Sequence, residues 1–64
     1  MTDLNNGLGT ALKALRKSRG MTQGQVAALA GIERTSITNI EAGRQMLRVS
    51  TMNAICNALG YEVH

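Results

Sequence analysis

The sequence predicts an all-α fold, a compact bundle of four to five short helices followed by a short C-terminal strand. Apolar residues recur at helical spacing in four segments, glycines separate these segments, and proline is absent. At 64 residues the chain has room for one domain, whose small core limits its stability. With one Tyr, no Phe and no Trp, that core must be aliphatic.

The first helix is predicted over residues 8–18. Its apolar stripe follows the i, i+3, i+4, i+7 spacing of an amphipathic helix and consists of Leu8, Ala11, Leu12 and Leu15. Residues 1–7 are polar and lack this spacing, so we expect a flexible N-terminus.

The central stretch over residues 23–43 predicts two short helices joined by a tight turn. Thr22 is a suitable N-cap for a helix over residues 23–30. Gly31 then interrupts the helical pattern, and it can adopt positive φ at little cost, so the chain can reverse there. A second helix follows over residues 34–41. Two helices joined by a glycine-containing turn form a helix-turn-helix.

The second of these helices has two different faces. At about 100° per residue, Ile37 and Ile40 point to one side. The opposite side is polar and carries Arg34, Thr35, Thr38 and Asn39. Glu33 precedes this helix as a weak N-cap.

The last helix is predicted over residues 49–59. Its core face is expected to consist of Val49, Met52, Ile55, Cys56 and Leu59. Residues 61–64 then alternate apolar and polar, which is the period of a strand. A lone strand is unstable in water, so two copies of the chain would pair through Tyr61 and Val63. The alternative is a frayed tail, with dimerisation through the last helix alone.

Composition excludes several classes of protein. No apolar run approaches the roughly 20 residues that span a bilayer, and no signal peptide follows Met1. Cys56 on a core face is interpreted as structural, and no metal-ligand or catalytic spacing is present. We therefore expect no enzyme activity, no cofactor or metal, no small-molecule substrate and no membrane partner. A single Cys fits a reducing, cytoplasmic location.

The charge distribution favours a polyanionic partner. The net charge is +3, and basic residues concentrate in the middle of the chain while Asp3 and Glu62 lie near its ends.

These features together resemble the phage repressor and Cro family, also called the Xre-type family, over residues 8–60. The matching positions are Arg16, Thr22, Gln23, Val26, Ala27, Gly31, Ile32, Ile37, Ile40, Glu41, Gly43, Met52, Ile55, Ala58 and Leu59. The resemblance implies a lambda-repressor-like domain that binds double-stranded DNA and regulates transcription. The expected protein is a repressor that binds a palindromic operator as a homodimer, with the helix over residues 34–41 in the major groove.

The resemblance and the docking geometry assign candidate residues. Bases would be read by Arg34, Thr35, Ser36, Thr38 and Asn39. Phosphates would be bound by Thr22, Gln23, Arg44, Lys17 and Arg19. The family also implies that Gln23 braces Arg34, and that Arg16 and Glu41 form an ion pair.

Two other functions remain open at this point. One is a DNA-binding antitoxin, which would also bind a toxin protein. The other is a protein-interaction module that kept the fold and lost DNA binding, and the presence of Arg34 and Gln23 counts against it.

Overall fold

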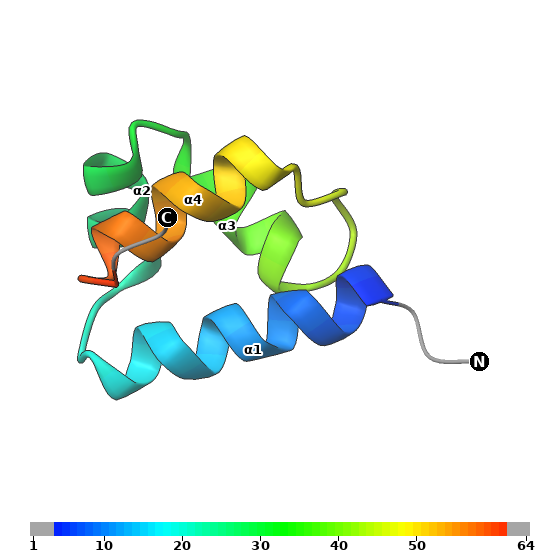
Figure 1. Cartoon of the computed structure of the whole chain (residues 1–64), viewed down its shortest axis with the longest axis horizontal. Coiled ribbons are helices and arrows are strands. Elements are labelled where there is room, and N and C mark those ends of the chain that lie inside the picture. The colour runs from blue at the N-terminus through cyan, green and yellow to red at the C-terminus, as the bar shows by residue number, and fades with distance from the viewer. Residues whose placement is uncertain (1–3, 62–64) are drawn as a thin grey trace.

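The computed structural model describes residues 4–61, with side chains from residue 7 onward, and consists of four helices (Figure 1). Their bounds are α1 Leu4–Ser18, α2 Gln23–Ala30, α3 Arg34–Glu41 and α4 Val49–Ala58. Helix α1 packs against α3, and α2 packs against both α3 and α4 (Figure 1). The predicted all-α class is confirmed.

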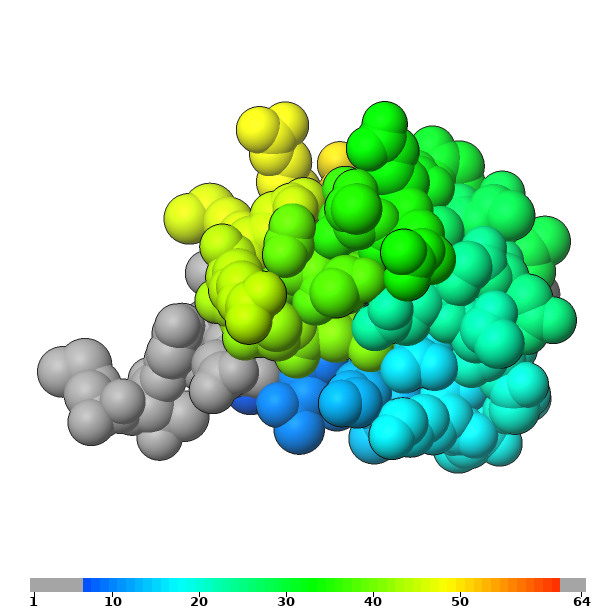
Figure 2. All heavy atoms as spheres, turned by 180° about the vertical axis from the view of Figure 1, so that it is seen from behind, coloured from blue at the N-terminus to red at the C-terminus, as the bar shows by residue number. Residues whose placement is uncertain are grey.

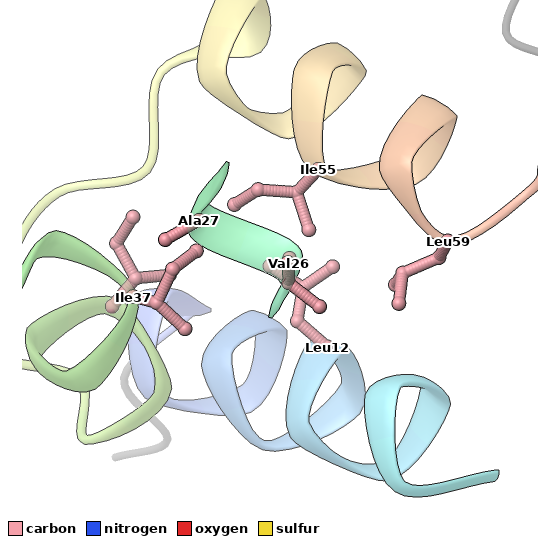
Figure 3. Packing of buried hydrophobic residues seen from close by; sticks show 7 residues of the cluster. Leu12, Val26, Ala27, Ile37, Ile55 and Leu59 are labelled. Carbon is pink, nitrogen blue, oxygen red and sulfur yellow. The ribbon is translucent and has the colours of Figure 1, made fainter. Parts of the chain in front are cut away.

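The four helices meet at an aliphatic core. Its buried residues are Leu12, Val26, Ala27, Ile37, Ile40, Ile55 and Leu59. Figure 3 shows Leu12 pointing from α1, and Ile55 and Leu59 pointing from α4 and its end, toward the α2 residues. Every helix contributes at least one of these residues, so no pair of helices buries the core alone.

The turn between α2 and α3 has the predicted geometry. Gly31 has φ 73° and its amide donates to the carbonyl of Ala27. At the other end of α2, Thr22 is the N-cap, and its hydroxyl accepts from the amide of Gln25 at 3.1 Å. The Gln25 side chain in turn accepts from the Thr22 amide at 2.8 Å, which completes a capping box. Both ends of α2 are therefore fixed by local hydrogen bonds.

Three predicted boundaries differ from the structure. Helix α1 begins at Leu4 rather than at residue 8, so residues 4–7, assigned above to the N-terminal segment, are helical. Helix α4 ends at Ala58, with Leu59 as its C-cap. No strand occurs in residues 4–61; Tyr61 lies in irregular structure, and Val63 lies outside the described residues.

Several side chains predicted to be in the core are exposed. Leu8 and Ala11 face solvent, Cys56 is half-buried, and Val49 is 70% exposed. Helical spacing identifies the residues that share a face. It does not show how far the neighbouring helices extend along that face, and Val49 begins α4 where the chain enters from an exposed loop.

Helix α1 approaches α3 closely at Gly9. This residue is buried, and a methyl group there would overlap the carbonyl oxygen of Ile40 and lie 3.1 Å from that of Glu41. Only glycine lets the two backbones come this close without a shift. The end of α3 is therefore positioned by direct backbone contact with α1.

Candidate nucleic-acid interface

The polar face of α3 lies beside the start of α2 on one side of the molecule. Ile37 and Ile40 are each 1% exposed and turn the opposite face of α3 into the core. Figure 2 shows α3 in green at the centre of this side, between the yellow-green α3–α4 loop and cyan atoms where α1 ends and α2 begins. The core contacts of α3 thus leave its polar face toward solvent.

An ion pair under this face joins α1 to α3. Arg16 Nε lies 2.7 Å from Glu41 Oε2, and Arg16 Nη2 lies 3.0 Å from Glu41 Oε1. Arg16 Nη1 also donates to the carbonyl of Met21 at 2.9 Å. Arg16 and Glu41 are 8% and 9% exposed. The structure therefore contains the pair that was expected, in a two-pronged geometry that is stronger than a single contact.

The surroundings of Glu41 keep its carboxylate ionised. Burial alone raises the pKa of Glu41, but the hydrogen bonds from Arg16 and Gln23 and the charges of Arg16 and Lys13 outweigh it and lower this pKa. The hydrogen bond to Glu41 in turn raises the pKa of Arg16. Both groups are therefore charged at neutral pH.

The resemblance implied that Gln23 braces Arg34, but in the structure Gln23 bonds Thr38 and Glu41. Its Nε2 donates to Glu41 Oε1 at 3.1 Å, and its Oε1 accepts from the Thr38 hydroxyl at 2.8 Å. The expected brace to Arg34 is wrong: the two ends of the Gln23 amide bond Thr38 and Glu41, which lie one turn and two turns along α3. The start of α2 is thus tied to the middle and the end of α3.

Arg34 is exposed at the first position of α3. Within residues 7–61 its guanidinium makes no side-chain hydrogen bond or ion pair. Its Cδ lies 3.8 Å from the point that a Cβ on Gly24 would occupy, so the stem of Arg34 runs beside the first turn of α2. Arg34 therefore has a guanidinium with five N–H donors free for a ligand, on a stem that passes the start of α2.

The other predicted site residues fall into two groups by exposure. Thr22, Thr35, Arg44 and Lys17 are exposed, while Ser36, Thr38 and Asn39 are half-buried. Thr35 Oγ1 lies 3.4 Å from a carboxylate oxygen of Glu33, and Glu33 makes no side-chain cap on α3.

Arg19 makes a contact with Tyr61 that no sequence pattern predicts. Its guanidinium carbon lies 4.5 Å from the centroid of the Tyr61 ring, within the range of a cation–π contact. Tyr61 itself is half-buried against the core. Arg19 therefore connects the end of α1 to the chain after α4, and a phosphate contact from it would compete with this packing.

Two structural features were missed although the sequence contains a signal for each. Thr22 and Gln25 have the spacing of a capping box. Gly9 lies within a helical pattern at a cost in helix propensity, which suggests a packing role, although Gly7 carries the same signal without a close contact. The hydrogen bonds of Gln23 had no such signal, because they depend on how α2 and α3 cross.

Residues 4–61 hold neither a membrane-spanning helix nor a cluster of metal-ligating side chains. Residues 4–61 contain no helix long and apolar enough to cross a membrane. In the same part of the chain, no three His, Cys, Asp or Glu residues gather as a metal site would require.

Residues 7–63 match the helix-turn-helix domain family, and the chain belongs to this family. It is 39% identical over 56 residues to the immunity repressor protein of Bacillus phage phi105. The aligned part is 88% of this chain but 39% of that protein, so the chain spans well under half of the relative's length.

Two solved structures have the same fold over nearly the whole chain. The clp gene regulator ClgR from Corynebacterium glutamicum is 27% identical with a TM-score of 0.90, over 97% of this chain and 80% of that one. The restriction-modification controller protein C.AhdI from Aeromonas hydrophila is 26% identical with a TM-score of 0.87, over 91% and 88% of the two chains.

Proposed function

We propose that this chain is a sequence-specific double-stranded DNA-binding domain of a transcriptional repressor. The observation that carries the proposal is the polar face of α3, where Arg34 and Thr35 are exposed beside the α2 N-terminus while Ile37 and Ile40 anchor the other face. In a helix-turn-helix the second helix enters the major groove with its N-terminal residues toward the bases. The family membership and the phage repressor relative support the same function.

The candidate residues divide between bases and phosphates. Arg34 at the start of α3 suits the O6 and N7 atoms of guanine, and Asn39 suits adenine. Thr35 and Ser36 line the same helix and are assigned to bases as well. Thr22 and Gln23 at the start of α2, Arg44 after α3, and Lys17 would hold phosphates, which fixes the register but reads no sequence.

The protein is also proposed to act as a homodimer on a palindromic operator. Two copies related by a two-fold axis would place their recognition helices about 34 Å apart, one turn of DNA. The interface would use Tyr61 and Val63, or the alternative surface of α4. The second option has support in two exposed apolar side chains, Met46 in the loop before α4 at 73% and Val49 at the start of α4 at 70%.

Selection of bound sites from a random DNA pool tests this function. The expected result is a preferred site with two inverted halves, bound more tightly than random duplex, and a steep loss of affinity as salt rises. Enrichment of no sequence, with weak binding to every duplex, would contradict it. No observation within residues 4–61 favours a toxin partner, so the antitoxin alternative is not carried further.

A further inference from the structure

We propose that Thr38 is a positioning residue for DNA binding rather than a residue that reads bases. The Thr38 hydroxyl bonds the oxygen of the Gln23 side-chain amide, and the Glu41 carboxylate bonds its nitrogen. Together they fix the orientation of this amide. This inference rests on the proposed function, because it concerns how Gln23 is presented to a phosphate.

The first step is the contact between Gln23 and Glu41. The amide atom of Gln23 that faces Glu41 Oε1 lies 3.1 Å from it. An ionised carboxylate can only accept hydrogen bonds, and Arg16 keeps this one ionised through contacts of 2.7 and 3.0 Å. The atom beside Glu41 must therefore be the nitrogen of the amide.

The second step fixes the other end of the amide. With the nitrogen toward Glu41, the oxygen of Gln23 faces Thr38, whose Oγ1 lies 2.8 Å away. That hydroxyl has one proton, and its other acceptor, the carbonyl of Arg34, is farther at 3.1 Å. Thr38 therefore donates to Gln23, and a reversed amide would place its oxygen against the carboxylate of Glu41.

The third step concerns what remains available to DNA. A phosphate oxygen accepts hydrogen bonds, so Gln23 can bind it only through an N–H group. One N–H of Gln23 goes to Glu41, the carbonyl is used by Thr38, and the second N–H has no other partner within residues 7–61. The held amide thus keeps one N–H donor for a phosphate, at the start of α2 where an anion is favoured.

The same arrangement leaves Arg34 unbraced. The carbonyl of Gln23 accepts from Thr38, and within residues 7–61 the Arg34 guanidinium has no side-chain hydrogen bond or ion pair, to Gln23 or to any other residue. Position 38 therefore requires a hydroxyl for its role and does not require a methyl group. This requirement is opposite to that of a threonine whose methyl contacts a thymine.

Two conservative substitutions separate the roles. Thr38→Val keeps the shape and removes the hydroxyl, whereas Thr38→Ser keeps the hydroxyl and removes the methyl group. Affinity of the full chain is measured for the selected site, its single-base variants and a random duplex, with circular dichroism showing that each variant is folded. We expect Thr38→Val to weaken binding to every duplex by about 3- to 10-fold, the scale of one hydrogen bond. Thr38→Ser should restore affinity to within about 2-fold of the unmodified chain.

A double-mutant cycle shows whether Thr38 acts through Gln23. In a Gln23→Ala background, Thr38→Val should cause no further loss of affinity, because the amide it positions is absent. An equal loss in both backgrounds would overturn the inference, as would a Thr38→Ser loss confined to one base pair. Unmodified affinity of Thr38→Val for all duplexes would overturn it while leaving the proposed function standing. If the unmodified chain binds no duplex at low salt, the proposed function fails and the inference with it.

Discussion

Arg34 at the start of α3 and Arg44 in the loop after it are both exposed arginines, yet we expect them to contribute differently to DNA binding. Arg34 starts the helix that would face the bases, so Arg34→Ala should relax the preference at one base pair and cost about 1–3 kcal/mol of binding free energy. Binding to a panel of single-base operator variants measures this. Full discrimination by Arg34→Ala would show that Arg34 does not read a base.

Arg44 follows α3 in the exposed loop and would contact a phosphate. Arg44→Ala should weaken binding to all sequences alike and reduce the slope of log affinity against log salt by about one. Titrations at several salt concentrations give this slope. An unchanged slope would mean that Arg44 does not neutralise a phosphate.

Gly7 and Gly9 form a matched pair in α1 with opposite expected effects on stability. Gly9→Ala would overlap the Ile40 carbonyl, so α1 must move away from α3, at a cost of about 1–3 kcal/mol of unfolding free energy. Gly7 is exposed and has no atom near the position of a Cβ, so Gly7→Ala should stabilise by about 0.5–1 kcal/mol through helix propensity. Urea denaturation compares them. Two changes of the same sign would mean that Gly9 does not make this close contact.

The contact between α1 and α3 also depends on the Arg16–Glu41 pair. Because both side chains are buried, removing one partner leaves the other charge buried and unpaired, which should cost about 3–5 kcal/mol of unfolding free energy. Removing both should cost less than the sum, with a coupling energy above about 1 kcal/mol in a cycle of Arg16→Met and Glu41→Gln. A coupling near zero would describe two independent charges, the usual result for an exposed pair.

The same pair makes the packing of α1 on α3 sensitive to acid. The pKa of Glu41 in the folded chain lies below its ordinary value of 4.5, so the unfolded chain takes up a proton first as pH falls. The contribution of Glu41 to stability is therefore fully present above about pH 5 and is lost as pH falls through the folded-state pKa. Unfolding free energy measured from pH 7 to pH 3 should show this loss.

Substitutions at two glutamates identify the source of the acid sensitivity. Glu41→Gln should flatten the dependence of stability on pH in the acid range. Glu33→Gln is the control, because Glu33 is exposed and its carboxylate has a single side-chain contact, to Thr35 at 3.4 Å. The interpretation fails if Glu33→Gln flattens the curve and Glu41→Gln does not.

At the scale of the whole molecule, the open prediction is how two copies associate. Removing residues 62–64 keeps Tyr61, its packing against the core and its contact with Arg19, so the domain should remain folded. If the C-terminal segment pairs the copies, sedimentation should show the shortened chain as a monomer that binds the operator weakly. An unchanged dimer would show that residues 62–64 are not needed for association and would favour another surface, such as the apolar start of α4.

Sequence periodicity and turn chemistry determined most of the fold. The bounds of α2 and α3 follow from Thr22, Gly31 and the spacing of Ile37 and Ile40, because capping and amphipathic spacing are local properties of the chain. The polar face of α3 and the candidate Arg34 follow from the same spacing. The start of α1 was less predictable, since the sequence around Leu4 is polar and lacks helical spacing.

Only the tertiary structure decided which candidate side chains are free to bind a ligand. The resemblance implied that Gln23 would brace Arg34, but the crossing of α2 and α3 brings it to Thr38 and Glu41 instead. Arg19 was assigned to a phosphate because its side chain is basic, but its guanidinium packs on the Tyr61 ring. The physical reason is the same in both cases: a hydrogen bond or a ring contact depends on distances between residues remote in sequence, which the packing of the helices sets and no local pattern records.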